Sequence, residues 1–172
     1  MRACTSKRSA PGLFWVMAAA LAMGSGRAAE VPANAAASAD HEPQLIQTLT
    51  GNAAWAEKDK ACRDLQVIGT PACVPALAQL LTDPQLSHSA RCALEPMPCR
   101  EAGEALRAAL ARTTGPLKAG IVNSLGFRRE QSAIPELLPL LKAEDALVAA
   151  AAATALGRIG SQAAVTALAD FR

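Results

Sequence analysis

Aromatic residues are scarce in this sequence: they make up 3% of its 172 residues, and tyrosine is absent. This composition argues against an all-β sandwich or barrel, because such folds are built from aromatic and β-branched residues. Charged residues amount to only 19% and apolar residues to 51%, which excludes a disordered acidic tail. Alanine, in contrast, occurs 41 times. Alanine and leucine at this density predict closely packed helices in about one domain.

The groups that carry catalysis are also few. The sequence has two histidines, His41 and His88, and it contains no Gly-x-Ser-x-Gly elbow, phosphate-binding loop or His-Glu-x-x-His motif. It also lacks a Cys-x-x-Cys pair, which argues against a zinc site, and a Cys-x-x-Cys-His haem-attachment motif. We therefore expect no catalytic residue, no metal site and no cofactor, and we expect His88 to be solvated at a helix start.

The N-terminal segment has the three-part layout of a secretory signal peptide. Basic residues come first, an apolar run of 11 residues spans Leu13–Met23, and small residues follow. This run is too short for a helix that crosses a bilayer about 30 Å thick. Cleavage is expected after Ala28 or Ala35. An uncleaved N-terminal membrane anchor is the alternative.

We accordingly expect an exported protein, either periplasmic or secreted, with residues 1–28 as signal peptide and residues 29–42 as a flexible lead-in. The signal carries four of the 17 basic residues and none of the 15 acidic ones. Its removal leaves 13 basic and 15 acidic side chains, a net charge of about −2. A nucleic-acid-binding surface needs an excess of positive charge, so we expect no nucleic-acid partner, and no membrane contact after cleavage.

The rest of the chain contains an internal repeat. Four leucines are spaced 29, 31 and 31 residues apart, namely Leu65, Leu94, Leu125 and Leu156. A second set follows each of them 12 residues later, namely Leu77, Leu106, Leu137 and Leu168. Two independent anchors that keep one period indicate about four helix pairs of about 30 residues each. The predicted fold is an all-α solenoid over residues 43–172, with the last repeat incomplete.

Glycine and proline mark the expected helix ends. Glycine near a helix C-terminus can adopt the left-handed conformation, which we expect at Gly69, Gly126 and Gly160. Pro75 and Pro135 lie inside the first helices of their repeats, where each removes a hydrogen-bond donor and should bend the helix. The second helix of the second repeat is expected to be short and to stop at Leu94, before two prolines.

Three segments resemble HEAT-like repeats. Val74-Pro-Ala-Leu77-Ala-Gln-Leu-Leu81 and Ile134-Pro-Glu-Leu137-Leu-Pro-Leu-Leu141 look like the first helix, and residues 148–160 look like the second. The short period is similar to the compact subtype first recognised in phycobilisome lyases. The resemblance covers about residues 43–171. It implies an α-solenoid that binds protein partners on its concave side, usually lined by the second helices.

The second helices therefore supply the candidate partner-binding residues. They are Arg91, Glu95, Asn123, Phe127, Arg128, Arg129 and Arg158. Arginine and aromatic side chains carry much of the binding energy of protein interfaces. The alternative is that these residues form a solvated polar face without a partner. Trp55 opens the first of these helices, and we expect it to plug the N-terminal end of the core rather than to serve as a ligand platform.

Four cysteines follow the predicted signal, namely Cys62, Cys73, Cys92 and Cys99. An even number in an oxidising compartment suggests disulfides. Each consecutive pair lies across a predicted turn, which favours the pairs 62–73 and 92–99. Buried free thiols, which behave as small apolar groups, are the alternative.

Taken together, the sequence predicts an exported HEAT-like scaffold without enzymatic activity, which binds a protein partner through its second helices. A structural stalk, or a fragment of a longer secreted enzyme or cytochrome, is the alternative, because the last repeat lacks its second helix. Lyase-like cofactor handling is a remote alternative that follows from the resemblance alone. It would need histidines, aromatic residues or reactive thiols in greater number.

Overall fold

The computed structural model describes the backbone of residues 33–170, and side-chain surroundings from residue 41 onward except at residues 167, 168 and 170. The predicted signal peptide, its Ala28 cleavage site and the alternative membrane anchor lie outside these residues. Within residues 33–170 the chain is helical, without a strand. No helix in this range is both long and apolar enough to cross a bilayer.

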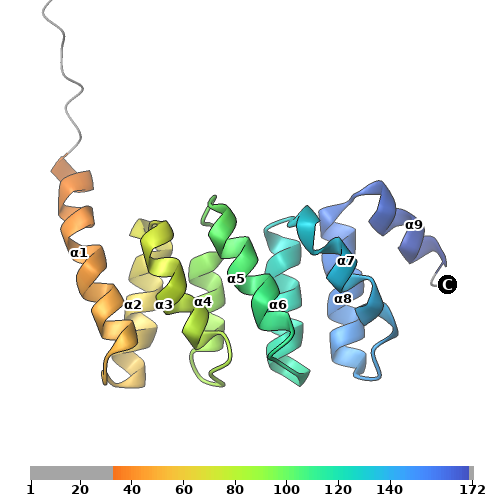
Figure 1. Cartoon of the computed structure of the whole chain (residues 1–172), viewed down its shortest axis with the longest axis horizontal. Coiled ribbons are helices and arrows are strands. Elements are labelled where there is room, and N and C mark those ends of the chain that lie inside the picture. The colour runs from red at the N-terminus through yellow and green to blue at the C-terminus, as the bar shows by residue number, and fades with distance from the viewer. Residues whose placement is uncertain (1–32, 171–172) are drawn as a thin grey trace, which may run out of the picture. The chain divides into compact units, whose positions relative to one another are not determined.

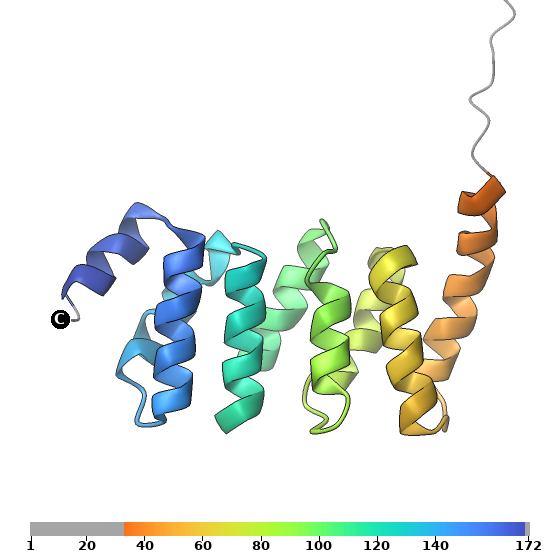
Figure 2. The ribbon, with the colours of Figure 1, turned by 180° about the vertical axis from the view of Figure 1, so that it is seen from behind.

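The helices alternate between two layers (Figure 1). The first layer consists of α1 (Ala33–Thr50), α3 (Val74–Leu80), α5 (Arg100–Leu110), α7 (Ile134–Leu137) and α9 (Gln162–Asp170). The second layer consists of α2 (Trp55–Ile68), α4 (Ser87–Leu94), α6 (Gly115–Phe127) and α8 (Ala146–Ile159), which stand side by side in Figure 2. Short 3₁₀ turns η1 (Pro71–Cys73), η2 (Gln131–Ala133) and η3 (Pro139–Lys142) flank α3 and α7.

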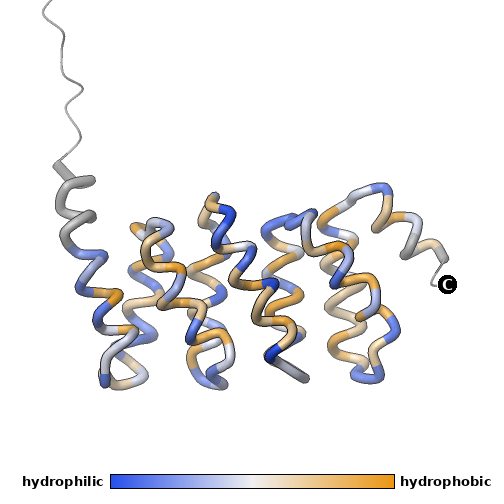
Figure 3. The backbone as a smooth tube through the Cα atoms, in the orientation of Figure 1, coloured by the Kyte–Doolittle hydropathy of each residue, from blue (hydrophilic) through white to orange (hydrophobic). Residues whose placement is uncertain are grey.

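Consecutive helices pair into four hairpins, α1/α2, α3/α4, α5/α6 and α7/α8, and α9 follows them. The leucine ladders explain this arrangement. All four leucines of the first set are fully buried, as are Leu77, Leu106 and Leu137 of the second. Apolar residues recur along each helix, while hydrophilic residues gather at many of the turns (Figure 3). Burial of each leucine stabilises the fold by about 1.5–3 kcal/mol. The predicted all-α solenoid of helical hairpins is confirmed.

Pro75 and Pro135 lie at helix starts and not in helix interiors. Pro75 is the second residue of α3, and Pro135 is the second residue of α7. Each follows a 3₁₀ turn. At the first turn of a helix the backbone N–H has no intrahelical acceptor, so proline loses nothing there. The predicted bends inside these helices were therefore wrong, whereas α4 does end at Leu94 as expected.

The three glycines differ in their roles. Gly160 adopts the left-handed conformation after α8, with φ of 65°, as predicted. Gly69 is extended with φ of −62°, and Gly126 lies within α6. The role of Gly126 is close packing, because a Cβ added there would lie 2.5 Å from the Cα of Ala155 in α8. The left-handed residue after α6 is instead Arg129, with φ of 53°.

Helix α1 begins in the segment that was expected to be flexible. Residues 33–42 of that segment are helical, so the prediction of a flexible lead-in was wrong for them. Alanine gives the segment a high helix propensity. Its end is also anchored, because the buried Glu42 accepts hydrogen bonds from the backbone N–H of Thr70 (2.8 Å) and from its hydroxyl (2.9 Å). The Glu42 carboxylate thus ties α1 to the start of η1.

Replacement of Glu42 by alanine is expected to lower the free energy of unfolding by about 2 kcal/mol, because it removes a buried carboxylate together with its hydrogen bonds to the backbone N–H and the hydroxyl of Thr70. Urea denaturation followed by circular dichroism measures this change. The matched control is Gln47→Ala, at an exposed position of the same helix, for which a change below about 0.5 kcal/mol is expected. Equal midpoints for the two variants would contradict the anchoring role of Glu42.

Candidate functional site

The second-layer helices expose equivalent positions in each hairpin. The residue two positions after each buried ladder leucine is exposed in all four hairpins: Val67, Pro96, Phe127 and Arg158. Val67, Phe127 and Arg158 lie within their helices, where two residues correspond to a rotation of about 200° and the position faces away from the core, whereas Pro96 lies in the turn after α4. Val67 is 84% exposed and Phe127 is 63% exposed. We call these four residues the outward row.

Arg128, which was predicted to bind a partner, is instead a cap for α4. Its guanidinium donates hydrogen bonds to the carbonyl oxygens of Leu94 (2.6 Å), Glu95 (3.1 Å) and Cys99 (3.0 Å), and also to that of Met97. The side chain is only 8% exposed. Because the prolines after Leu94 end the helix, these carbonyls lack helical partners. Arg128 is therefore used within the fold, and its predicted partner-binding role stays a prediction that these contacts do not support.

Arg91 and Glu95, two further candidates, connect α4 to α6. The Arg91 guanidinium donates to the carbonyl of Gly120 and to the hydroxyl of Ser124, both at 3.1 Å. The Ser124 hydroxyl in turn donates to the Glu95 carboxylate at 2.7 Å. Burial lowers the pKa of the Arg91 guanidinium. Both side chains are half-buried and engaged inside the fold, and their predicted partner-binding role stays a prediction.

The remaining four candidates are exposed: Asn123, Phe127, Arg129 and Arg158. Their side chains make no hydrogen bond or ion pair with the residues that the structure describes. Helices α6 and α8 approach closely where Gly126 meets Ala155. Phe127 follows the first of these residues, and Arg158 lies one turn after the second. The structure therefore brings the end of α6 and the last turn of α8 together at one edge of the second layer.

A hollow of about 410 Å³ lies beside Phe127. Its other lining residues belong to the turn after α4 and to the turn after α6, namely Glu95, Pro96, Met97, Pro98, Arg128 and Glu130. The Glu130 carboxylate accepts a hydrogen bond from the Ser132 hydroxyl at 2.5 Å. A second hollow of about 310 Å³ is lined by Met97 and Pro98 together with residues 69–71 and Cys99.

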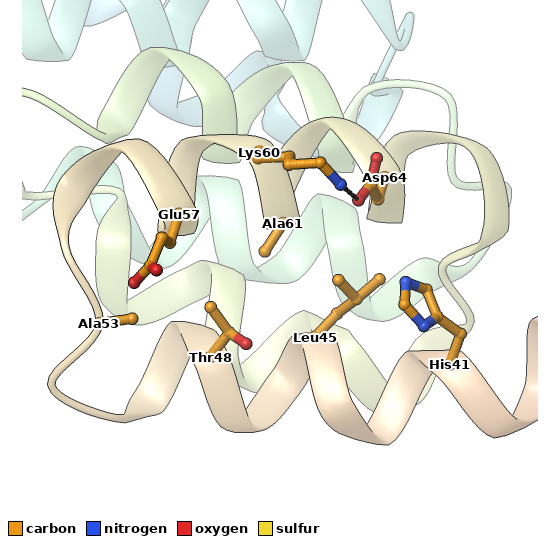
Figure 4. Close-up of a pocket in the computed structure, with 8 residues that line it drawn as sticks. All are labelled: His41, Leu45, Thr48, Ala53, Glu57, Lys60, Ala61 and Asp64. Carbon is orange, nitrogen blue, oxygen red and sulfur yellow. Dashed lines mark hydrogen bonds and ion pairs between the residues drawn. The ribbon is translucent and has the colours of Figure 1, made fainter.

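Another hollow of about 310 Å³ lies between α1 and α2 (Figure 4). Leu45 and Ala61 face one another across it, with His41 at one end. The acidic groups around it are engaged by the chain itself: Asp64 pairs with Lys60 at 2.8 Å, and Glu57 accepts the N–H of Ala54 at the start of α2. Nowhere in the described part of the chain do three or more His, Cys, Asp or Glu side chains form a possible metal site.

Trp55 is 60% exposed at the first residue of α2, so the prediction that it plugs the core was wrong. This end of the core is filled by Leu45, Leu49 and Ala61, which are buried. His88 is exposed as expected. Its Nδ1 lies 3.2 Å from a guanidinium nitrogen of Arg91.

The four described cysteines are free thiols, in contrast to the predicted disulfides 62–73 and 92–99. Cys73 Sγ lies 3.0 Å from the place of a Cβ on Gly69, which follows the last residue of α2. Cys62 lies seven residues before Gly69, about 10 Å along the helix axis, whereas bonded cysteines have Cβ atoms about 3.8 Å apart. Cys92 lies against His88 of its own helix, with 3.8 Å between Sγ and Nε2.

Under native conditions at about pH 8, we expect iodoacetamide to modify Cys92 and Cys99 before Cys62 and Cys73. The first two are half-buried, whereas burial raises the pKa of Cys62 and of Cys73 to about 12, so these remain protonated. Peptide mapping by mass spectrometry measures the order. All four should react in guanidinium chloride, and a residue that resists alkylation there would reveal a disulfide. Early modification of Cys62 or Cys73 would contradict their burial.

The hairpins of the second half of the chain contain most of the exposed candidates, and this half can be compared with known families. Residues 103–172 match a family model of HEAT repeats. The match runs from within α5 through α9 and includes Asn123, Phe127, Arg129 and Arg158. HEAT repeats commonly mediate protein–protein interaction and are generally scaffolds without catalytic activity. Comparison with curated proteins finds no match for the chain.

Proposed function

We propose that this protein is a non-catalytic HEAT-repeat scaffold that binds a protein partner through the outward row of its second layer. The observation that carries the proposal is the exposure of Val67 (84%) and Phe127 (63%) at the same register of two hairpins. Single exposed apolar residues are ordinary on protein surfaces, but a repeat that places them in register puts them on the same side of the second layer. The HEAT match of residues 103–172 supports the class of function.

The proposal extends to the whole folded unit and to its location. The spacings of 29 and 31 residues support the compact HEAT-like subtype first recognised in phycobilisome lyases. The three-part layout of residues 1–28 supports export and cleavage after Ala28. Cleavage after Ala35 would remove the first residues of α1. The mass of the protein recovered from the exported fraction tests the proposed cleavage, because an intact N-terminus would contradict it.

The test of the binding face is a pull-down from exported-fraction extract with the immobilised protein. We expect a partner that the parent chain retains and that a Val67→Ser, Phe127→Ser variant retains at about a tenth of that level or less. The matched control is Leu147→Ser, which removes an apolar side chain that is 53% exposed near the start of α8, outside the row. Equal retention by the row variant would overturn the proposal, and an empty result with folded protein would favour the stalk alternative.

A further inference from the structure

Arg129 has a backbone conformation that normally belongs to glycine. Helix α6 ends in a Schellman motif: the N–H of Glu130 bonds to the carbonyl of Leu125 (3.0 Å), and the N–H of Arg129 bonds to the carbonyl of Gly126 (3.1 Å). The residue in the left-handed position of this motif is Arg129, with φ of 53°. At the equivalent position of the next hairpin, four residues after the ladder leucine, the chain has Gly160.

The fold gains nothing from the arginine at this position. A residue with a Cβ is strained in the left-handed region, so glycine would be more stable there. The Arg129 side chain is exposed, and it makes no hydrogen bond or ion pair with the described residues. The strain at Arg129 is therefore not offset by any contact of its guanidinium inside this part of the chain. Strain of this kind points to a role for the side chain outside the fold.

The surface next to Arg129 has an excess of unpaired positive charge. Arg158 is also exposed and unpaired among the described residues. No acidic residue occurs in α6 or between Ala146 and Ser161. The two carboxylates that line the hollow beside Phe127 are already engaged: Glu95 accepts from Ser124, and Glu130 accepts from Ser132 and lies 4.0 Å from Arg128 Nε.

We propose that Phe127, Arg129 and Arg158 form a binding site for an acidic peptide segment, in which a carboxylate pairs with the two arginines next to an apolar side chain on Phe127. This inference rests on the proposed function and names the chemistry of the partner. Arginine binds carboxylates with two parallel hydrogen bonds, and an exposed ring adds apolar contact area. A nucleic acid is disfavoured, because residues 29–172 carry 13 basic and 15 acidic side chains and so lack the broad basic surface that a phosphate backbone needs.

The test is a selection of randomised 12-residue peptides on the immobilised full chain at an ionic strength of about 0.15 M. We expect enrichment of peptides with Asp or Glu next to an apolar residue. A labelled peptide from the selection should lose affinity by about tenfold or more in fluorescence anisotropy with an Arg129→Gly, Arg158→Ala variant. The same loss is expected when its acids become amides. Arg112→Ala, which removes an exposed arginine after α5, is the control and should bind normally.

Arg129→Gly alone separates binding from structure. We expect its unfolding midpoint to rise while its peptide affinity falls, whereas an arginine with a structural role would lose stability. The acidic-peptide site would be overturned by selected peptides without acids, by no enrichment at all, or by equal binding of the double variant. The outward row is tested separately, by the pull-down described above. A single-stranded oligonucleotide that binds more tightly than the peptide, and is lost in the same variant, would overturn the inference as well.

Discussion

The Arg128→Ala variant is expected to be less stable than the parent protein by about 3 kcal/mol. The guanidinium bonds to four backbone carbonyls at the end of α4 and in the turn that follows it, and the substitution leaves these acceptors without their donor. Hydrogen bonds to charged groups contribute about 1.5–3 kcal/mol each, but partial rearrangement recovers some of this energy. Guanidinium denaturation followed by circular dichroism measures the difference.

Two further variants define what Arg128 does. Arg128→Lys keeps the charge but lacks the planar fork, so it is expected to recover less than half of the lost stability. Arg158→Ala removes an exposed arginine and should leave the midpoint nearly unchanged. If Arg128→Ala were as stable as the parent, α4 would not need the Arg128 cap. If Arg128→Lys recovered all of the lost stability, the positive charge alone would be enough to cap α4.

A pair of glycine-to-alanine changes should shift stability in opposite directions. Gly126→Ala is expected to lower the free energy of unfolding by about 2 kcal/mol, because the new Cβ would lie 2.5 Å from the Cα and 2.7 Å from the Cβ of Ala155. Gly157→Ala is expected to raise it by about 0.5–1 kcal/mol, because Gly157 lies in α8 with nothing within 4 Å of an added Cβ.

The two substitutions are chemically identical and both lie in second-layer helices, so each is the control of the other. Thermal unfolding of both variants under one set of conditions is sufficient. If Gly126→Ala were as stable as the parent, α6 and α8 would have room to move apart. If Gly157→Ala were destabilised, its position would be packed against a group outside the described residues.

The leucine ladders show why the fold could be predicted from the sequence. Leu65, Leu94, Leu125 and Leu156 are all fully buried, because each hairpin presents the same position to the space between the layers. A periodic fold therefore leaves a period in the sequence. The boundary of the fold was harder to predict, because alanine-rich residues before Glu42 fit both a linker and a helix. The contact between Glu42 and Thr70, 28 residues apart, decides in favour of the helix.

The candidate site was predictable only in part. Exposure of Phe127 and Arg158 follows from their register relative to buried leucines. The roles of Arg91 and Arg128 depend on partners in the neighbouring hairpin, since Arg91 meets Gly120 and Arg128 meets Cys99, in each case 29 residues away. This separation is close to the repeat period, which is the one signal in the sequence that could have revealed both contacts. For Trp55, nothing in the sequence distinguished a buried position from an exposed one.

The cap that Arg128 places on α4 bears on the order in which the chain folds. Helix α4 has eight residues, too few for a helix to persist alone in water. During synthesis its residues emerge more than 30 positions before the arginine that completes its end. A nascent chain that stops short of α6 would hold a second hairpin whose α4 end is not yet capped. The second hairpin therefore becomes fully stable only after the third has been synthesised and folded.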